Sequence, residues 1–477
     1  VRLPSIIAMV ANAVMVYHIG RQMFDHRTAQ RAMLMFGTAV LPIYIGTAAM
    51  SDSVLNLSIT VAIFTFIDAA YRGFRWWQPV ALALALAVAQ LTKGPVGLAV
   101  PLLMFAAAAI FGRREIRIGW AWWIGCVAAV LGGTGLFLAW AIPANIATDG
   151  QFAAEGLGRH VGQRMTSAME GHGGSNLPEY ILTIPLYVPL LIAGFFPWII
   201  HLPAAVRAII GRRLADGRVR VLLVAWAVPT FVLMSLIATK LPHYILPIYP
   251  ALALAASAMV TQRLAEGLNE KDRDWLRGGI WFFGPVAVLT VGGLLAAPFL
   301  IGHTRLLSVM IVPALIVVAL SVFAIRHQLA ERVGSTTSWL AAGTPIFFIV
   351  TSVLAMPKLD AALKPGPTLA AAVHAEVADD APVYVMGYDE PSLMFYMNRP
   401  AELPLTHMTV EQAAQWARAN GDGALIITRE RLEELIRLRG PLALRQIGSH
   451  DVINYSAGGK RAQVLAVVTV PSSSTPD

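Results

Sequence analysis

The sequence predicts a polytopic α-helical membrane protein that ends in a small α/β domain. Of its 477 residues, 57% are hydrophobic and only 13% are charged, whereas about a quarter of the residues in soluble proteins are charged. Long apolar stretches follow one another as far as residue 355, and the remaining residues have the mixed pattern of a soluble domain. This composition excludes a soluble enzyme.

About twelve membrane-spanning helices are expected within residues 1–355. A helix needs roughly 20 apolar residues to cross a hydrocarbon core of about 30 Å, and some stretches are short enough to need their flanks. The sequence has no series of roughly ten-residue alternating segments, which would indicate the strands of a membrane barrel. The candidate spans lie near residues 4–22, 33–49, 53–70, 78–92, 95–111, 120–142, 180–203, 219–238, 243–261, 279–301, 306–324 and 338–355.

The positions of basic residues predict the orientation of these helices, because cytoplasmic loops are enriched in Lys and Arg. Basic residues gather after every second span, beginning with the first, so those connections are expected in the cytoplasm. The alternate connections, including the long loop 143–179, are expected outside. The same alternation places residue 1 outside, and the chain begins with Val. We therefore expect a first helix and its outer loop to be missing from this sequence.

Residues 356–477 are expected to form a small extracytoplasmic α/β domain. Short β-branched runs and amphipathic segments alternate there, which is typical of such domains. Strands are predicted at 381–386, 424–428 and 462–470, and helices at 410–419 and 429–438.

Two lysines break the expected charge pattern. Lys93 and Lys240 lie in short outer connections, each beside a helix break made by Pro or Gly. Such a lysine is well placed to bind a phosphate headgroup, and the alternative is a side chain that extends from a helix end towards water.

Asp52 is the only acid in the short outer loops, and it begins the third span. It is expected to cap that helix, to act on an acceptor hydroxyl as a catalytic base, or to do both.

The loop 143–179 carries three further candidates. If the stretch around them is helical, His160 and Arg164 share one face, and together with His172 they could bind a phosphate. Two histidines twelve residues apart are a weak zinc signal, so a metal stays unknown, and an ordinary solvated loop is the alternative.

Cysteine and tryptophan give two further expectations. The single cysteine, Cys126, lies in an apolar run, so neither a disulfide framework nor a thiolate metal cluster can form. The tryptophans of Trp76-Trp77, Trp122-Trp123 and Phe-Pro-Trp198 are interpreted as anchors at the membrane interface.

The motifs follow one another as Met-Ser-Asp52-Ser, Leu-Thr-Lys93-Gly, Arg-His160-x-x-x-Arg164, His172, Phe-Pro-Trp198 and Lys240-Leu-Pro-His243-Tyr244. In this order they resemble the GT-C membrane glycosyltransferases that use polyprenyl-phosphate sugars. That group includes the protein O-mannosyltransferases and the bacterial aminoarabinose transferases of lipid A. The resemblance runs into the C-terminal domain, and it implies a GT-C fold with one helix more than the twelve counted here.

The resemblance implies an inverting glycosyltransferase in the bacterial inner membrane. Residues 1–355 would form its transmembrane glycosyltransferase domain. They would move a sugar from a polyprenyl-phosphate donor to a lipid, glycan or protein acceptor at the outer face. Asp52 matches the family's second functional acid, whereas the leading catalytic acid lies in the first outer loop, which this chain lacks. By the same resemblance Lys93, Arg164 and Lys240 would bind the donor phosphate, and His160, His172, His243 and Tyr244 would line the substrate cavity.

The residues suit this chemistry without a nucleotide-binding loop or a nucleic-acid partner. Displacement of a polyprenyl phosphate leaves negative charge that Lys or Arg can stabilise, and a carboxylate can deprotonate the attacking hydroxyl. No cofactor is certain, and a divalent metal stays open. A polytopic transporter or flippase is a second hypothesis, although transporters place ionisable residues near the bilayer midplane and show internal repeats. A non-catalytic binder of lipid-linked sugars is a third.

Overall fold

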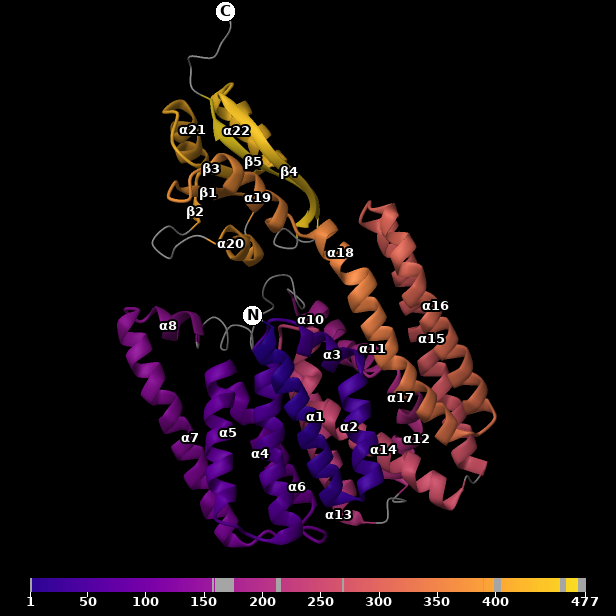
Figure 1. The fold of residues 1–477 in the computed structure, drawn as a ribbon. Coiled ribbons are helices and arrows are strands. Elements are labelled where there is room, and N and C mark those ends of the chain that lie inside the picture. Colours follow the sequence, from indigo (N-terminus) through magenta and orange to yellow (C-terminus); the bar gives the residue numbers. More distant parts are fainter. Residues whose placement is uncertain are drawn as a thin grey trace, which may run out of the picture. The chain divides into compact units, whose positions relative to one another are not determined.

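The computed structural model divides the chain into two compact units (Figure 1). Unit 1 comprises residues 1–291 and 315–347, and unit 2 comprises residues 292–314 and 348–477. The predicted domain boundary at residue 356 stays a prediction. The structure describes residues 2–156, 158, 176–211, 216–267, 270–388, 390–398, 405–454 and 460–470.

Unit 1 is a bundle of helices, as the sequence predicts. Helices that are far apart in the sequence lie side by side in it (Figure 1). Its elements up to residue 266 are α1 (Leu3–Met23), α2 (His26–Thr38), α3 (Val40–Thr47), α4 (Asp52–Arg72), α5 (Trp77–Lys93), α6 (Val96–Phe111), α7 (Trp120–Ala147), α8 (Gln151–Ala153), α10 (Leu177–Thr183), η2 (Ile184–Leu186), α11 (Tyr187–Gly194), η3 (Trp198–His201), α12 (Leu202–Ile210), α13 (Gly217–Leu236), η4 (Pro242–Ile248) and α14 (Tyr249–Glu266).

Nine helical stretches of the described chain are long and apolar enough to cross a membrane, and the protein is a multi-pass membrane protein. Three of them are α15 (Glu270–Leu300), η5 with α16 (Thr304–Leu306, Leu307–Leu329), and α17 with η6 and α18 (Val333–Val350, Thr351–Ala355, Met356–Leu363).

Some predicted spans differ from the helices observed. The spans 78–92 and 95–111 match α5 and α6 to within one residue at each end, but two other predicted spans are divided. The span 33–49 is two helices rather than one, because Ala39 between them has an extended backbone with ψ of 145°. The span 180–203 is likewise divided into short helices. Apolar composition alone therefore overestimated helix continuity near the ends of the bundle.

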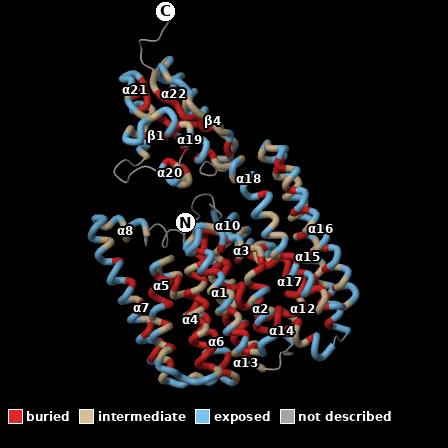
Figure 2. The backbone as a smooth tube through the Cα atoms, viewed as in Figure 1, coloured by how far each residue is buried: buried red, intermediate tan, exposed pale blue. Residues whose placement is uncertain are grey.

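Among the nine candidate spans of the described chain, α4 and the stretch of η4 with α14 are the most buried, and buried residues concentrate around them (Figure 2). α4 packs against α1, α5 and α6, and α14 packs against α2, α12 and α13. Small residues permit these close approaches, as is usual between membrane helices. A Cβ atom at Gly133 of α7, for example, would come within 2.7 Å of the carbonyl oxygen of Ala83 in α5.

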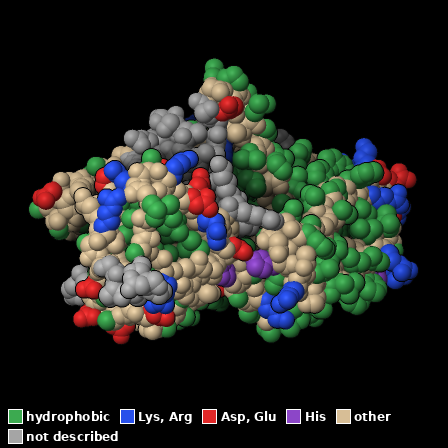
Figure 3. All heavy atoms as spheres, turned by 90° about the horizontal axis from the view of Figure 1, so that it is seen from above, with side chains coloured by type: hydrophobic (Ala, Val, Ile, Leu, Met, Phe, Trp, Pro, Cys, Tyr) green, Lys and Arg blue, Asp and Glu red, His purple; other side chains and the backbone are tan. Residues whose placement is uncertain are grey.

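Hydrophobic side chains also cover much of the outer surface, as the view from above shows (Figure 3). The interpretation of the tryptophans as interfacial anchors is only partly supported. Trp76 is 79% exposed, but Trp122 and Trp198 are buried, so the interpretation is wrong for these two. Trp122 packs against the ring of Phe66, and the Trp198 indole donates a hydrogen bond to the Thr38 hydroxyl.

Unit 2 contains a five-stranded sheet with helices on both faces. The strand order is β2-β1-β3-β5-β4, in which β1 is parallel to β2 and β3, and β5 is antiparallel to its neighbours β3 and β4. The side chains of β3 alternate between two cores, so that Ile426 packs with α19 while Leu425 packs with α21 and α22. The elements are α19 (Gly366–Glu376), β1 (Val383–Met386), α20 (Pro391–Met397), β2 (Thr406–His407), α21 (Val410–Arg418), β3 (Ala424–Thr428), α22 (Arg429–Arg439), β4 (Leu444–Asn454) and β5 (Lys460–Thr469).

The predicted fold class is confirmed for this unit, and its five predicted elements all form. The edge strand β4 was missed, because its sequence Leu-Arg-Gln-Ile-Gly-Ser-His-Asp-Val-Ile-Asn carries polar residues and a glycine in place of a β-branched run. The ladder to β5 compensates for this, with a bulge between Gln446 and Gly448.

Candidate functional site

Asp52 is the first residue of α4 and lies at the end of the bundle that was predicted to face outward. The capping position belongs to Ser51, whose side chain makes no capping hydrogen bond. The interpretation of Asp52 as the helix cap is therefore wrong. Its carboxylate is nevertheless buried, with only 5% of the residue exposed. A buried carboxylate needs a partner, because burial removes its hydration.

That partner is Lys93, the last residue of α5. The Lys93 Nζ atom donates a hydrogen bond of 2.6 Å to Oδ1 of Asp52. The two helices form a hairpin, so the end of α5 returns to the start of α4. Gly94 then ends α5 with a φ of 58°, a conformation that side chains rarely adopt. The sequence Lys-Gly-Pro thus fixes the ammonium beside the carboxylate.

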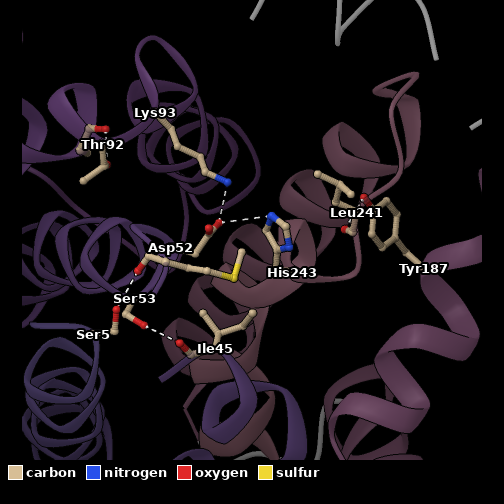
Figure 4. A network of polar contacts seen from close by, with 11 residues as sticks. Ser5, Ile45, Asp52, Ser53, Thr92, Lys93, Tyr187, Leu241 and His243 are labelled. Carbon is tan, nitrogen blue, oxygen red and sulfur yellow. Dashed lines mark hydrogen bonds and ion pairs between the residues drawn. The ribbon is translucent and has the colours of Figure 1, made fainter. Parts of the chain in front are cut away.

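The third member of this cluster is His243, which comes from η4. Its Nε2 atom lies 3.7 Å from Oδ1 of Asp52, the same oxygen that the Lys93 ammonium contacts (Figure 4). The neighbouring ring of Tyr244 lies below the Lys93 ammonium at 4.9 Å from Nζ to the centroid. The structure therefore brings four of the predicted site residues together from α4, α5 and η4.

These four residues share one cavity of about 410 Å³. A volume of this size is typical of small-ligand sites. Aromatic and aliphatic side chains make most of its wall, among them Phe137 and Trp140 of α7. Phe152 and Gly156 from the loop 143–179 also line it. The cavity thus joins a charged cluster to an apolar interior, as a lipid-linked polar substrate would require.

Lys240 is placed differently. Its ammonium donates hydrogen bonds to the backbone oxygens of Ser235 and Ile237, close to the end of α13. The rings of Tyr180 and Tyr187 lie 5.6 and 5.8 Å from Nζ. Burial lowers the pKa of this lysine. Lys240 does not line the cavity described above, so its role as a phosphate ligand stays a prediction.

Three predicted site residues, His160, Arg164 and His172, lie outside the described residues. Within the residues that the structure describes, no group of three or more His, Cys, Asp or Glu side chains could hold a metal ion. The arrangement around Asp52 can instead bind an anion through Lys93, because an ammonium has three N–H donors and Asp52 accepts only one here.

Sequence reasoning missed the two side-chain amides of the cavity, Asn56 and Gln90. Each lies about one helical turn from a predicted residue, Asn56 four residues after Asp52 and Gln90 three residues before Lys93. A polar residue at this spacing in an apolar helix was the signal that could have identified them.

Comparison with known proteins was made for both sequence and structure. Residues 1–136 match the family model described as dolichyl-phosphate-mannose-protein mannosyltransferase. One relative is the undecaprenyl phosphate-alpha-4-amino-4-deoxy-L-arabinose arabinosyl transferase of Pectobacterium carotovorum subsp. carotovorum (strain PC1). It is 28% identical over 302 residues, which cover 62% of this chain and 51% of the relative. The protein of the same name from Pectobacterium atrosepticum is 26% identical over 73% of this chain and 60% of its own length.

The chain spans about half the length of the first of these relatives. The fold of this chain is similar to that in the crystal structure of ArnT from Cupriavidus metallidurans bound to undecaprenyl phosphate. The TM-score is 0.71 at 19% identity, with coverage of 100% of this chain and 85% of that chain. These findings confirm the expected resemblance to GT-C membrane glycosyltransferases that use polyprenyl-phosphate sugars.

Proposed function

We propose that this protein is an inverting glycosyltransferase that moves a sugar from a polyprenyl-phosphate donor to a lipid, glycan or protein acceptor. The observation that carries the proposal is the contact of the Asp52 carboxylate with the Lys93 ammonium inside one cavity of a multi-pass helical bundle. The names of the relatives support undecaprenyl phosphate as the lipid and 4-amino-4-deoxy-L-arabinose as the first sugar to test.

In the proposed reaction the bond between sugar C1 and the donor phosphate oxygen breaks, and a bond from C1 to the acceptor oxygen forms. Negative charge develops on the departing phosphate, which the Lys93 ammonium would stabilise through N–H groups not directed at Asp52. The proton of the acceptor hydroxyl would move to the Asp52 carboxylate. His243, at 3.7 Å from that carboxylate, would orient it.

We also propose that the site faces away from the cytoplasm and that the protein resides in the bacterial inner membrane with its C-terminal domain outside. Lys93 supports this, because it is one of the few cations at an end of the bundle whose connections are poor in basic residues. The opposite connections carry clusters such as Arg113, Arg114 and Arg117.

The test is a transfer assay with the full-length gene product in proteoliposomes. The donor would be radiolabelled undecaprenyl-phosphate-linked 4-amino-4-deoxyarabinose and related glycosides, and the acceptors would be lipid A, glycans and proteins of the host membrane. Transfer that is lost in Asp52→Asn at equal protein levels supports the proposal. Tight donor binding without transfer to any acceptor would instead indicate a binder, and movement of intact donor across the bilayer would indicate a flippase.

A further inference from the structure

A buried amide lies deeper in the same cavity than the charged cluster. Asn56 is on α4, one helical turn after Asp52, and lines the cavity with only 1% of the residue exposed. Among the described residues neither Nδ2 nor Oδ1 of Asn56 has a hydrogen-bond partner. A buried amide without a partner is destabilising, so its presence on a cavity wall points to a ligand that supplies the missing bonds.

A second amide faces the cavity at the same level from the neighbouring helix. Gln90 is one turn before Lys93 on α5, and it is 4% exposed. Its Nε2 donates to the Leu86 carbonyl and its Oε1 accepts from the Thr134 hydroxyl at 3.3 Å. These bonds fix the orientation of Gln90 and leave one N–H and one lone pair for another partner.

The cavity thus has two polar layers of different character. The layer near its mouth holds the charges of Asp52 and Lys93, and the layer about one turn deeper, or roughly 5 Å, holds the neutral amides of Asn56 and Gln90. The lining residues on α4 at the deeper level are otherwise apolar, namely Leu55 and Ile59. A charged group would be poorly compensated there, whereas a hydroxyl can both donate to an amide oxygen and accept from an amide nitrogen.

We propose that Asn56, together with Gln90, binds hydroxyl groups of the sugar that the donor carries, and so determines which sugar is accepted. This inference rests on the proposed function, since it assigns the sugar to the deeper layer and the phosphate to Lys93. A site built to bond a hydroxyl discriminates strongly against a sugar that lacks it, because the amides are then left unpaired.

Binding measurements on the full-length protein test this assignment separately from catalysis. Dissociation constants would be measured in nanodiscs for bare undecaprenyl phosphate and for undecaprenyl phosphate carrying 4-amino-4-deoxyarabinose, glucose, mannose or galactose. The wild type should bind at least one glycoside more tightly than the bare lipid. Asn56→Leu should weaken that glycoside about threefold to tenfold, as expected for one or two uncharged hydrogen bonds, and leave the bare lipid unchanged. Lys93→Ala should weaken both ligands.

Asn12→Leu is the matched control. Asn12 on α1 is fully buried, neither of its amide atoms has a partner among the described residues, and it does not line the cavity. Its substitution should leave the preference for glycoside over bare lipid intact. Because leucine is branched differently from asparagine, Asn56→Ala is the second variant, and thermal unfolding would verify that each protein is folded.

The outcomes separate the two proposals. The inference is overturned if no glycoside binds more tightly than the bare lipid, or if both Asn56 variants keep the wild-type preference, as expected if Asn56 binds only water. Glycoside binding that depends on Asn56 without any sugar transfer would support the inference and reject the proposed enzymatic function. Transfer activity with an unchanged sugar preference in the Asn56 variants would support the proposed enzymatic function and overturn the inference about Asn56.

Discussion

Nζ of Lys93 lies 2.6 Å from Oδ1 of Asp52, although 41 residues separate them in the sequence. The hairpin of α4 and α5 makes this contact, and the pair as a whole carries no net charge, which lessens the free energy needed to bury it. Without Lys93 the buried Asp52 carboxylate would lose its ion-pair partner, whereas the Lys93 side chain is itself partly exposed. The substitutions that test the site must therefore separate a chemical role from this mutual dependence.

Asp52→Asn should lower turnover by about a hundredfold to ten-thousandfold, the range usual for loss of a general base, while donor affinity changes little. The amide oxygen can still accept the hydrogen bond from Lys93, so the ammonium keeps its place. Turnover and donor dissociation constants would be measured on the same preparation. Asp68→Asn is the control, because Asp68 is also a buried acid of α4 but bonds Gln22 and Gln78 at its other end. Equal loss of turnover in both variants would contradict a special role for Asp52.

Lys93→Ala and Lys240→Ala should have different effects, although the sequence predicted the same role for both. Loss of a charge-assisted bond to phosphate should weaken donor binding about tenfold to a hundredfold in Lys93→Ala. Lys240→Ala should instead lower thermal stability, because two backbone carbonyls near the end of α13 lose their donor. Donor titration and thermal unfolding of both variants would measure this. If Lys240→Ala weakened donor binding as much as Lys93→Ala, Lys240 would be a phosphate ligand, as the sequence predicted.

The sequence predicted the polar residues of the site better than their surroundings. Lys93 and Asp52 were recognisable because each contradicts a simple expectation, a cation in a loop otherwise poor in basic residues and an acid at the start of an apolar span. The contact between them depends on how two helices pair, which hydropathy does not encode. Asn56 was missed although its spacing places it on the same face of α4 as Asp52, because hydropathy does not show that this face lines a cavity.

Amino-acid composition also could not predict where the apolar helices break or where the tryptophans lie. A tryptophan at a helix end can lie at the membrane interface or in a packed core, and the sequence is the same in both cases. The Trp198 indole is buried because Thr38 accepts its N–H, and Thr38 belongs to α2, far away in the sequence. By contrast, the three inner strands of unit 2 were predictable from local patterns, whereas the two edge strands, β2 and β4, were missed.

Trp198→Phe should therefore destabilise the protein by about 0.5–1.5 kcal/mol through loss of the hydrogen bond to Thr38. The free energy of unfolding would be obtained by titration with SDS in mixed micelles. Trp76→Phe is the control, because Trp76 is exposed and its indole makes no hydrogen bond to any residue that the structure describes. If the two variants were equally stable, the interpretation of Trp198 as a core residue would fail.

Unit 2 should lose stability as the pH falls, in part through Glu376. Its carboxylate accepts a 2.8 Å hydrogen bond from Nη2 of Arg445, and this bond holds the pKa of Glu376 below its ordinary value of 4.5. A carboxyl group whose pKa is lowered by folding stabilises the folded state at pH values above its ordinary pKa. This stabilisation is lost as the pH falls through the lowered pKa of the folded state. The effect should be small and sensitive to salt, because both side chains are exposed.

Hydrogen exchange of the β4 and α19 amides between pH 6 and 3 would measure this loss, after correction for the intrinsic pH dependence of exchange. Glu376→Gln should show a shallower dependence on pH than the wild type. Glu433→Gln, which removes a carboxylate for which the described residues show no ion pair, should behave like the wild type. An identical pH dependence in Glu376→Gln and wild type would exclude the contribution of this pair.

The proposed orientation can be tested by labelling single cysteines with a membrane-impermeant maleimide, after the buried Cys126 is replaced by Ala. Ala147→Cys, at the end of α7 beyond the cavity, and Asp422→Cys in unit 2 should react in intact spheroplasts, since both are exposed and predicted to face outward. Arg114→Cys lies in a basic connection that is predicted to be cytoplasmic, so it should react only after lysis. Reaction at 147 only after lysis would reverse the orientation and place the Asp52 cavity in the cytoplasm. Reaction at 147 but not at 422 in spheroplasts would leave the cavity outside and place the C-terminal domain on the opposite side.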